Sequence, residues 1–150
     1  GEEGQGWAQV TAELALERSG PERFLSSHVL LESVCETLNE QPDDAMLALL
    51  GEWAAELWVL RQMSLSVASR LERGEAPMLE AAIVKDLGAR YEQSIARDLS
   101  GAFTASSFSD AGAGIEPVLT YLVANSPCFS LRGGTREILR GIIARELGLR

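Results

Sequence analysis

The stretch LRGGTREILRGIIARELGLR, Leu131–Arg150, places two adjacent glycines in front of an amphipathic helix. Its apolar residues recur three and four positions apart, and this spacing puts them on one face of an α-helix. Gly148 predicts the helix end, so the expected helix spans about Thr135–Leu147. A capping residue alone suffices to begin a helix, so the doubled glycine indicates that another group comes close to the backbone there. The apolar face comprises Ile138, Leu139, Ile142, Ile143 and Leu147.

Helical spacing also dominates upstream of this stretch, and no segment alternates polar and apolar residues for long enough to predict a strand. The Gly20–Pro21 pair predicts a kink in the first helical zone, because proline removes one hydrogen bond of a helix. A fourth zone begins with a short helix near Ile115–Ala124 and leads through NSPC to the final helix, and the segment 104–114 before it is expected to be a loop. The first three zones span about Trp7–Asn39, Asp44–Arg73 and Pro77–Phe103.

Two of these zones carry long apolar stripes that predict a shared core. Asp43 or Asp44 can cap the second zone, and Pro77 suits the first turn of the third. Helices of about 25 to 30 residues are about 40 Å long, and long antiparallel helices joined by short turns form bundles. We therefore predict an all-α, up-and-down four-helix bundle. The stripes are Met46, Leu49, Leu50, Trp53, Leu57, Leu60, Val67 and Leu71, and then Leu79, Ile83, Leu87, Tyr91, Ile95, Leu99 and Phe103.

The bulk composition restricts the possible functions. A chain of 150 residues with 46% hydrophobic residues can bury the core of one domain. A formal net charge of −9 argues against a nucleic acid or an anionic membrane as partner. No apolar run is long enough to cross a membrane, and no charged-then-apolar start indicates a signal peptide. The expected location is the cytoplasm.

The chain has few residues that could bind a metal. Cys35 and Cys128 lack metal-ligand spacing, and His28 is the only histidine, so too few soft ligands remain for a zinc site. A Ser-His-Asp or Cys-His device could use only His28, which lies among apolar helical neighbours. We expect both cysteines to be reduced residues of the core rather than a disulfide.

Two segments of the sequence are candidates for a functional site. The turn at Arg132–Glu137 combines Gly-Gly, which lets a ligand approach the backbone, with Thr135, which can cap the helix and leave amide donors for an anionic or polar group. The second place is Glu17, which follows the apolar run Leu14–Leu16 and precedes Arg18. A carboxylate in apolar surroundings has a raised proton affinity and can act as a general base.

Together, ERSG near the start and LRGGTREILRGIIARELGLR at the end resemble the two ends of the C-terminal helical domain of acyl-CoA dehydrogenases. The resemblance implies an FAD enzyme that removes two hydrogens across the α,β carbons of an acyl-CoA thioester. It also implies an electron-transfer flavoprotein-type acceptor and a homo-oligomer or hetero-oligomer. On this resemblance residues 1–6 are expected to be a linker from an upstream β-domain, and the chain to be a piece of a longer enzyme.

The resemblance also implies the roles of individual residues. Thr135 and Glu137 occupy flavin-contact positions of the family. Gly133 and Gly134 lie at substrate-contact positions, and Arg18 matches an arginine that lies along the bound thioester.

Two departures from the family pattern affect the site. Many members carry the catalytic glutamate directly before Gly-Thr, where this chain has Gly133, and a glycine cannot abstract a proton. Another branch of the family takes its base from the first helix of the domain, and the corresponding residue is Glu17. The Arg-x-x-Phe-Gly motif that usually reaches a neighbouring subunit's FAD is replaced here by ETLNEQPDD, which leaves that contact open.

Three alternatives remain at this point. The chain can belong to a non-catalytic subunit of the same family, to a flavin monooxygenase on the same scaffold, or to a helical interaction domain without a ligand. Glu17 together with Gly133 favours a working dehydrogenase, whereas the missing arginine motif favours a silent subunit.

Overall fold

The computed structural model describes residues 1–38, 42–102 and 115–149, and every regular element among them is a helix. Asn39, Phe103 and the loop predicted over 104–114 lie outside the described residues. The elements are α1 (Gly6–Ser19), the short 3-10 helix η1 (Pro21–Arg23), α2 (His28–Thr37), α3 (Asp44–Glu72), α4 (Met78–Ala102), α5 (Ile115–Phe129) and α6 (Arg136–Glu146).

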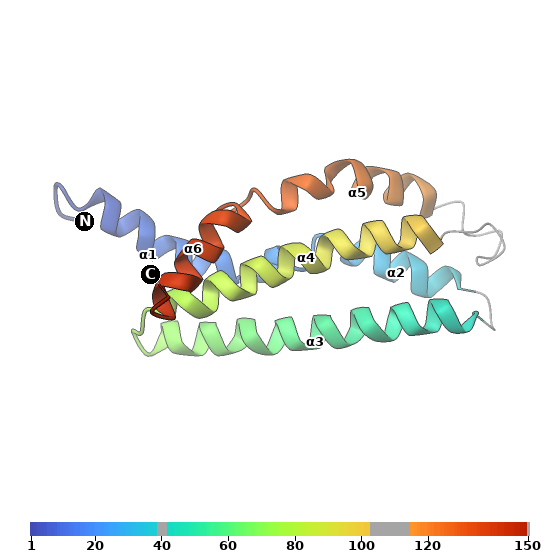
Figure 1. The fold of residues 1–150 in the computed structure, drawn as a ribbon, viewed down its shortest axis with the longest axis horizontal. Coiled ribbons are helices and arrows are strands. Elements are labelled where there is room, and N and C mark those ends of the chain that lie inside the picture. Colours follow the sequence, from blue (N-terminus) through green and yellow to red (C-terminus); the bar gives the residue numbers. More distant parts are fainter. Residues whose placement is uncertain (39–41, 103–114, 150) are drawn as a thin grey trace.

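Figure 1 shows how these helices form a bundle. The long helices α3 and α4 lie side by side and run in opposite directions. Helices α1 and α2 follow one another along the bundle, α5 lies along the second half of α4, and α6 crosses its first half. The chain thus runs along the bundle in four passes of alternating direction, formed by α1 with α2, by α3, by α4, and by α5 with α6. This confirms the predicted all-α, up-and-down four-helix bundle.

Helix α4 is the centre of the bundle, because α1, α3, α5 and α6 all pack against it. The predicted stripe is buried at Tyr91, Ile95 and Leu99. Alanines on the other sides of α4 are buried as well. Small side chains at these positions let the backbones of the surrounding helices come close to α4. The predicted stripe of α3 is confirmed by Met46, Trp53, Leu60 and Val67, each at most 2% exposed.

The first predicted zone is two helices rather than one kinked helix. Helix α1 ends at Ser19, and the chain turns through an extended Gly20 and through η1 before α2 begins. The turn passes directly over α4: a Cβ atom added to Gly88 would lie 2.5 Å from the carbonyl oxygen of Arg23. Pro21 therefore begins a separate element, and Gly88 leaves room for it.

Helix α5 is longer than predicted, because it continues from Ala124 through NSPC to Phe129 with Pro127 inside it. A proline cannot donate its backbone hydrogen bond to the carbonyl four residues earlier, here that of Val123. The hydroxyl of Ser126 donates to that same oxygen at 3.1 Å. A side chain thus replaces the missing backbone donor and lets the last turn form.

Other local expectations have mixed outcomes. The Asp43 side chain accepts a hydrogen bond from the Met46 amide at 2.7 Å and caps α3, as predicted. Cys35 and Cys128 are free thiols, but both are exposed, so their placement in the core was wrong. Among the described residues we find no helix with the length and apolarity that a membrane span requires.

Candidate functional site

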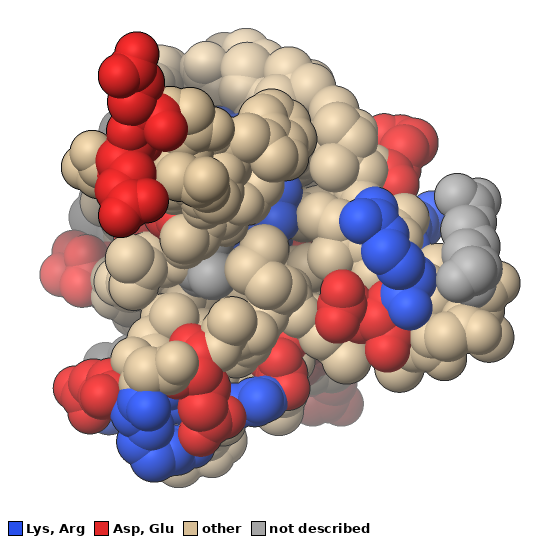
Figure 2. Space-filling model, turned by 90° about the vertical axis from the view of Figure 1, so that its left-hand side faces the viewer, with Lys and Arg blue, Asp and Glu red and all other residues tan. Residues whose placement is uncertain are grey.

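The two sequence motifs meet at one end of the bundle. A cavity of about 710 Å³ lies between α1 and α6, and Glu17, Arg18, Gly133 and Gly134 all line it. In the end-on view of Figure 2, the centre of this end is mainly uncharged apart from a small basic patch. Acidic side chains lie together at upper left, and acidic and basic side chains lie next to one another at lower left and at right. The apolar wall comprises Trp7, Leu14, Met78, Ile138 and Ile142.

The doubled glycine has a backbone reason. Gly133 has φ +69° and Gly134 has φ +113°, both in the region that side chains rarely adopt. A Cβ atom on Gly133 would lie 3.5 Å from the Glu17 Oε1 atom and 3.6 Å from the Lys85 Cε atom. The glycine therefore leaves a space beside the Glu17 carboxylate without a close backbone contact.

Glu17 is tied to an arginine that the sequence reading did not single out. Arg23 donates through Nε to the backbone oxygen of Glu17 at 2.8 Å, and its Nη2 forms an ion pair with Oε1 of the same residue. The Arg23 side chain is 7% exposed and that of Glu17 is 39% exposed. Because that backbone oxygen belongs to the last turn of α1, Arg23 also caps the helix. Of the apolar run that precedes Glu17, Leu16 is exposed, whereas Leu14 lines the same cavity as Glu17.

Arg18 holds the glycine turn rather than the Glu17 carboxylate. Its Nε donates to the carbonyl oxygen of Gly133 at 2.8 Å, across 115 residues of sequence. The side chain is buried, and burial lowers the pKa of the guanidinium while the charge of Glu17 opposes that shift. Arg18 therefore binds the turn, although it directly follows Glu17 in the sequence.

Thr135 and Glu137 lie at the start of α6. Thr135 is the N-cap residue, but its hydroxyl makes no capping hydrogen bond to the helix, which corrects the capping prediction. Glu137 is exposed, and its pKa is lowered, first by its own backbone amide and then by the hydroxyl of Thr135. Both residues therefore lie at the rim of the site, next to Gly134.

Two charged residues behind the turn, Lys85 and Glu92, were missed by sequence reasoning. Lys85 on α4 donates to the carbonyl oxygen of Phe129 at 2.6 Å. Glu92 lies about two helical turns after Lys85 on α4. Its carboxylate accepts hydrogen bonds from Arg132 at 3.1 Å and from the Ser26 amide at 2.6 Å. Burial raises the pKa of Glu92, and these two partners oppose the shift. The available signal was a lysine among small residues, AAIVKDLGA, in a chain with no other lysine.

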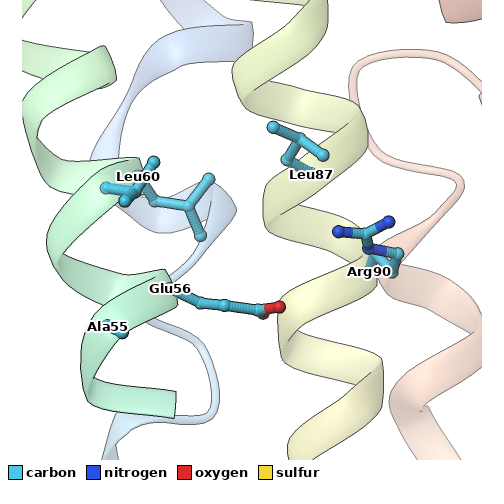
Figure 3. Close-up of a pocket in the computed structure, with 6 residues that line it drawn as sticks. Ala55, Glu56, Leu60, Leu87 and Arg90 are labelled. Carbon is cyan, nitrogen blue, oxygen red and sulfur yellow. The ribbon is translucent and has the colours of Figure 1, made fainter. Parts of the chain in front are cut away.

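Further cavities lie elsewhere on the bundle. One of about 240 Å³ lies between α3 and α4, where Glu56 extends from α3 toward α4 and Leu60 faces Leu87 (Figure 3). Arg90 lies on the α4 side of this cavity. In the part of the chain that the structure describes, no group of three His, Cys, Asp or Glu residues could hold a metal ion.

Fold and site together define a helical-bundle domain that places a helix carboxylate beside a two-glycine turn. The chain matches the family model of the acyl-CoA dehydrogenase C-terminal domain over residues 4–148. It therefore belongs to the acyl-CoA dehydrogenase family, as a C-terminal domain. No curated protein matches the chain in sequence.

Proposed function

We propose that this domain takes part in the α,β-dehydrogenation of an acyl-CoA thioester, with Glu17 as the base that removes the α-proton. One observation carries the proposal: Oε1 of Glu17 lies 3.5 Å from the point at which a Gly133 side chain would begin. A carboxylate from α1 thus reaches the space that a glutamate in the turn would otherwise occupy.

The ion pair with Arg23 fits this role. A carboxylate has two oxygens, so an ion pair through Oε1 leaves Oε2 to accept a proton. Arg23 also fixes the backbone of α1 at the same residue, which limits the positions that the Glu17 side chain can take. A base of this kind must be held within hydrogen-bond reach of the proton that it removes.

The residues at the start of α6 fit a flavin cofactor. FAD would supply the acceptor for the hydride that leaves the β-carbon. Thr135 and Glu137 would contact it, because the Thr135 side chain does not cap the first turn of α6, and the amides of that turn other than that of Glu137 can face a polar group of the cofactor. Gly134 adds no side chain that would keep such a group away.

The substrate would lie in the cavity between α1 and α6. Arg18 would lie along the thioester and hold the turn through its hydrogen bond to Gly133. Gly134 would contact the substrate through its backbone. The apolar wall would cover part of the acyl chain. Electrons would pass to an electron-transfer flavoprotein-type acceptor, and the enzyme would act as an oligomer.

Relocation of the base tests this proposal. In the whole enzyme with its flavin, Glu17→Gly should lower turnover by about 100-fold or more, as expected for the loss of a general base. Adding Gly133→Glu should recover part of that loss, because the new carboxylate would begin at the vacated place. Recovery should be incomplete, since φ +69° strains any side chain at residue 133. Equal turnover in the Glu17→Gly variant and the unchanged enzyme would contradict the proposal.

The second candidate is a non-catalytic subunit of the same family. It is favoured by the contact of Glu17 with the buried Arg23, because a permanently paired carboxylate would serve only to hold α1 and η1 together. In that case Glu17→Gln would weaken the domain without altering flavin reduction by the partner subunit's site.

A further inference from the structure

Lys85 is the only lysine of the chain, and it is buried in the first half of α4 with 1% of its surface exposed. Burying an ammonium group costs free energy unless its hydrogen bonds and charge are compensated. No carboxylate of the described residues lies within ion-pair distance of its Nζ atom; the partner is the backbone oxygen of Phe129. A methionine of similar length would avoid this cost, so stability of the core alone does not account for a lysine here.

The partner of Lys85 is the last residue of α5, and it begins the turn that leads to the site. The last carbonyls of a helix lack helical partners and carry the negative end of the helix dipole. An ammonium group at Phe129 O therefore fixes the point at which the chain leaves α5. Lys85 also lies close to the site itself. A Cβ atom added to Gly133 would lie 3.6 Å from the Lys85 Cε atom and 3.5 Å from the Glu17 Oε1 atom.

Three charged side chains thus hold the turn at three nearby points. Lys85 binds Phe129 O, Glu92 binds the side chain of Arg132, and Arg18 binds Gly133 O. The last two contacts act on the turn itself, whereas that of Lys85 sets where the turn begins. A shift at Phe129 would move the Gly133 backbone relative to the Glu17 carboxylate, because only three residues lie between Phe129 and Gly133.

We infer that Lys85 is a positioning residue of the proposed site: by binding the carbonyl oxygen of Phe129 it fixes the Gly133–Gly134 turn beside Glu17. This inference rests on the proposed function. It assigns Lys85 no contact with substrate or cofactor.

The charge of Lys85 responds to pH within the range of enzyme assays. Burial lowers the pKa of the ammonium from 10.5 to about 8, the nearby guanidinium groups lower it too, and two carboxylates on α4 oppose the shift. The neutral amine is a weaker donor than the ammonium, so the bond to Phe129 should loosen as the pH rises through about 8. The charged groups around Lys85 are Glu17, Arg18, Arg23, Asp86, Glu92 and Arg132.

The test compares Lys85→Met with Arg90→Met in the whole enzyme with bound flavin. Arg90 is an exposed cation on the same helix, at the cavity between α3 and α4, so its loss controls for charge alone. We expect Lys85→Met to lower kcat by about 10-fold or more with a much smaller change in KM, as misplacement of a reacting group does. Arg90→Met should leave both nearly unchanged. A folded Lys85→Met enzyme with a normal kcat would overturn the inference.

Hydrogen exchange gives a readout that does not depend on activity. Amides of residues 130–135 should exchange faster in Lys85→Met than in Arg90→Met, and equal exchange in both would overturn the inference. If Lys85→Met does not fold, the unchanged enzyme decides: its kcat should fall as the pH rises through about 8, and a flat profile there would overturn the inference. Failure of the proposed function is recognised separately, by normal flavin reduction when Glu17 is replaced by glutamine.

Discussion

Gly134 shows how a single residue sets the shape of the site. Its φ of +113° is accessible to glycine alone, although the nearest side-chain atom to a Cβ there would be an ordinary 3.6 Å away. Gly134→Ala should therefore lower the free energy of unfolding by about 1–3 kcal/mol through backbone strain. The matched control is Gly141→Ala on α6, where a Cβ atom meets nothing within 4 Å. That change should raise stability by about 0.5–1 kcal/mol, and denaturant unfolding of both variants compares them.

Lys85 makes a second prediction at this scale. Because its pKa is lowered to about 8 in the folded protein, the unfolded chain holds the lysine proton more tightly at a pH between about 8 and 10.5. The contribution of Lys85 to the free energy of unfolding should then rise with pH across this window, by up to about 3 kcal/mol. Urea unfolding of the unchanged protein and of Lys85→Met at pH 7.5 and 10 measures it. A constant difference between the two proteins would contradict the prediction.

This stability change runs opposite to the expected loss of activity above pH 8. If Lys85 served stability alone, the free energy of unfolding would rise above pH 8 and kcat would stay the same. The opposite signs therefore separate positioning of the turn from support of the core.

Single residues also show how far the sequence determines the site. The two-glycine turn and Glu17 could be predicted, because glycine pairs and helix carboxylates are visible as letters, and the structure brings them to one cavity. Arg23, Lys85 and Glu92 could not be assigned, because their roles depend on contacts between distant helices. Arg18 is the sequence neighbour of Glu17, but neighbouring residues on a helix point about 100° apart, and the ion pair of Glu17 is with Arg23 instead.

At the scale of elements, the close approach of η1 to α4 predicts the effect of a helical glycine. Gly88→Ala would place a Cβ atom 2.5 Å from the carbonyl oxygen of Arg23, so η1 must shift. Such overpacking should destabilise the fold by about 1–3 kcal/mol, and the shift should disturb the Arg23–Glu17 pair. Gly51→Ala on α3, where the added atom meets nothing within 4 Å, should be neutral or stabilising. Thermal unfolding of the two variants tests the difference, and equal melting temperatures would contradict it.

The elements themselves were predictable where periodicity is strong and long. The bounds of α3 agree with prediction within one residue, because Asp43 caps it and its apolar stripe is continuous. The breaks were less predictable. Gly20–Pro21 ends one helix instead of bending it, whereas Pro127 remains inside α5 because Ser126 satisfies the carbonyl that proline cannot.

At the scale of the whole molecule, large apolar side chains remain uncovered. Trp7 is 81% exposed, Trp58 62% and Tyr121 66%, and they lie on α1, α3 and α5. Exposed apolar surfaces of this kind favour association. We expect the isolated 150-residue chain to self-associate as its concentration rises, and light scattering measures this. A strictly monomeric chain at high concentration would contradict the expectation.

The isolated chain should also bind FAD weakly, because in the proposed site few residues of this domain would contact a large cofactor. Circular dichroism should show a helical protein, and equilibrium dialysis should show little bound flavin. Tight stoichiometric binding would contradict the view that other parts of the enzyme complete the site.

The central claim is that Glu17 removes the α-proton of the substrate, and anaerobic rapid mixing of the whole enzyme with acyl-CoA tests it most directly. Glu17→Gln keeps the size of the side chain and removes its basicity. The account predicts that this variant binds FAD and acyl-CoA nearly normally, while the rate of flavin reduction falls by about 100-fold or more. A near-normal rate of flavin reduction in Glu17→Gln would contradict the account and favour the non-catalytic subunit.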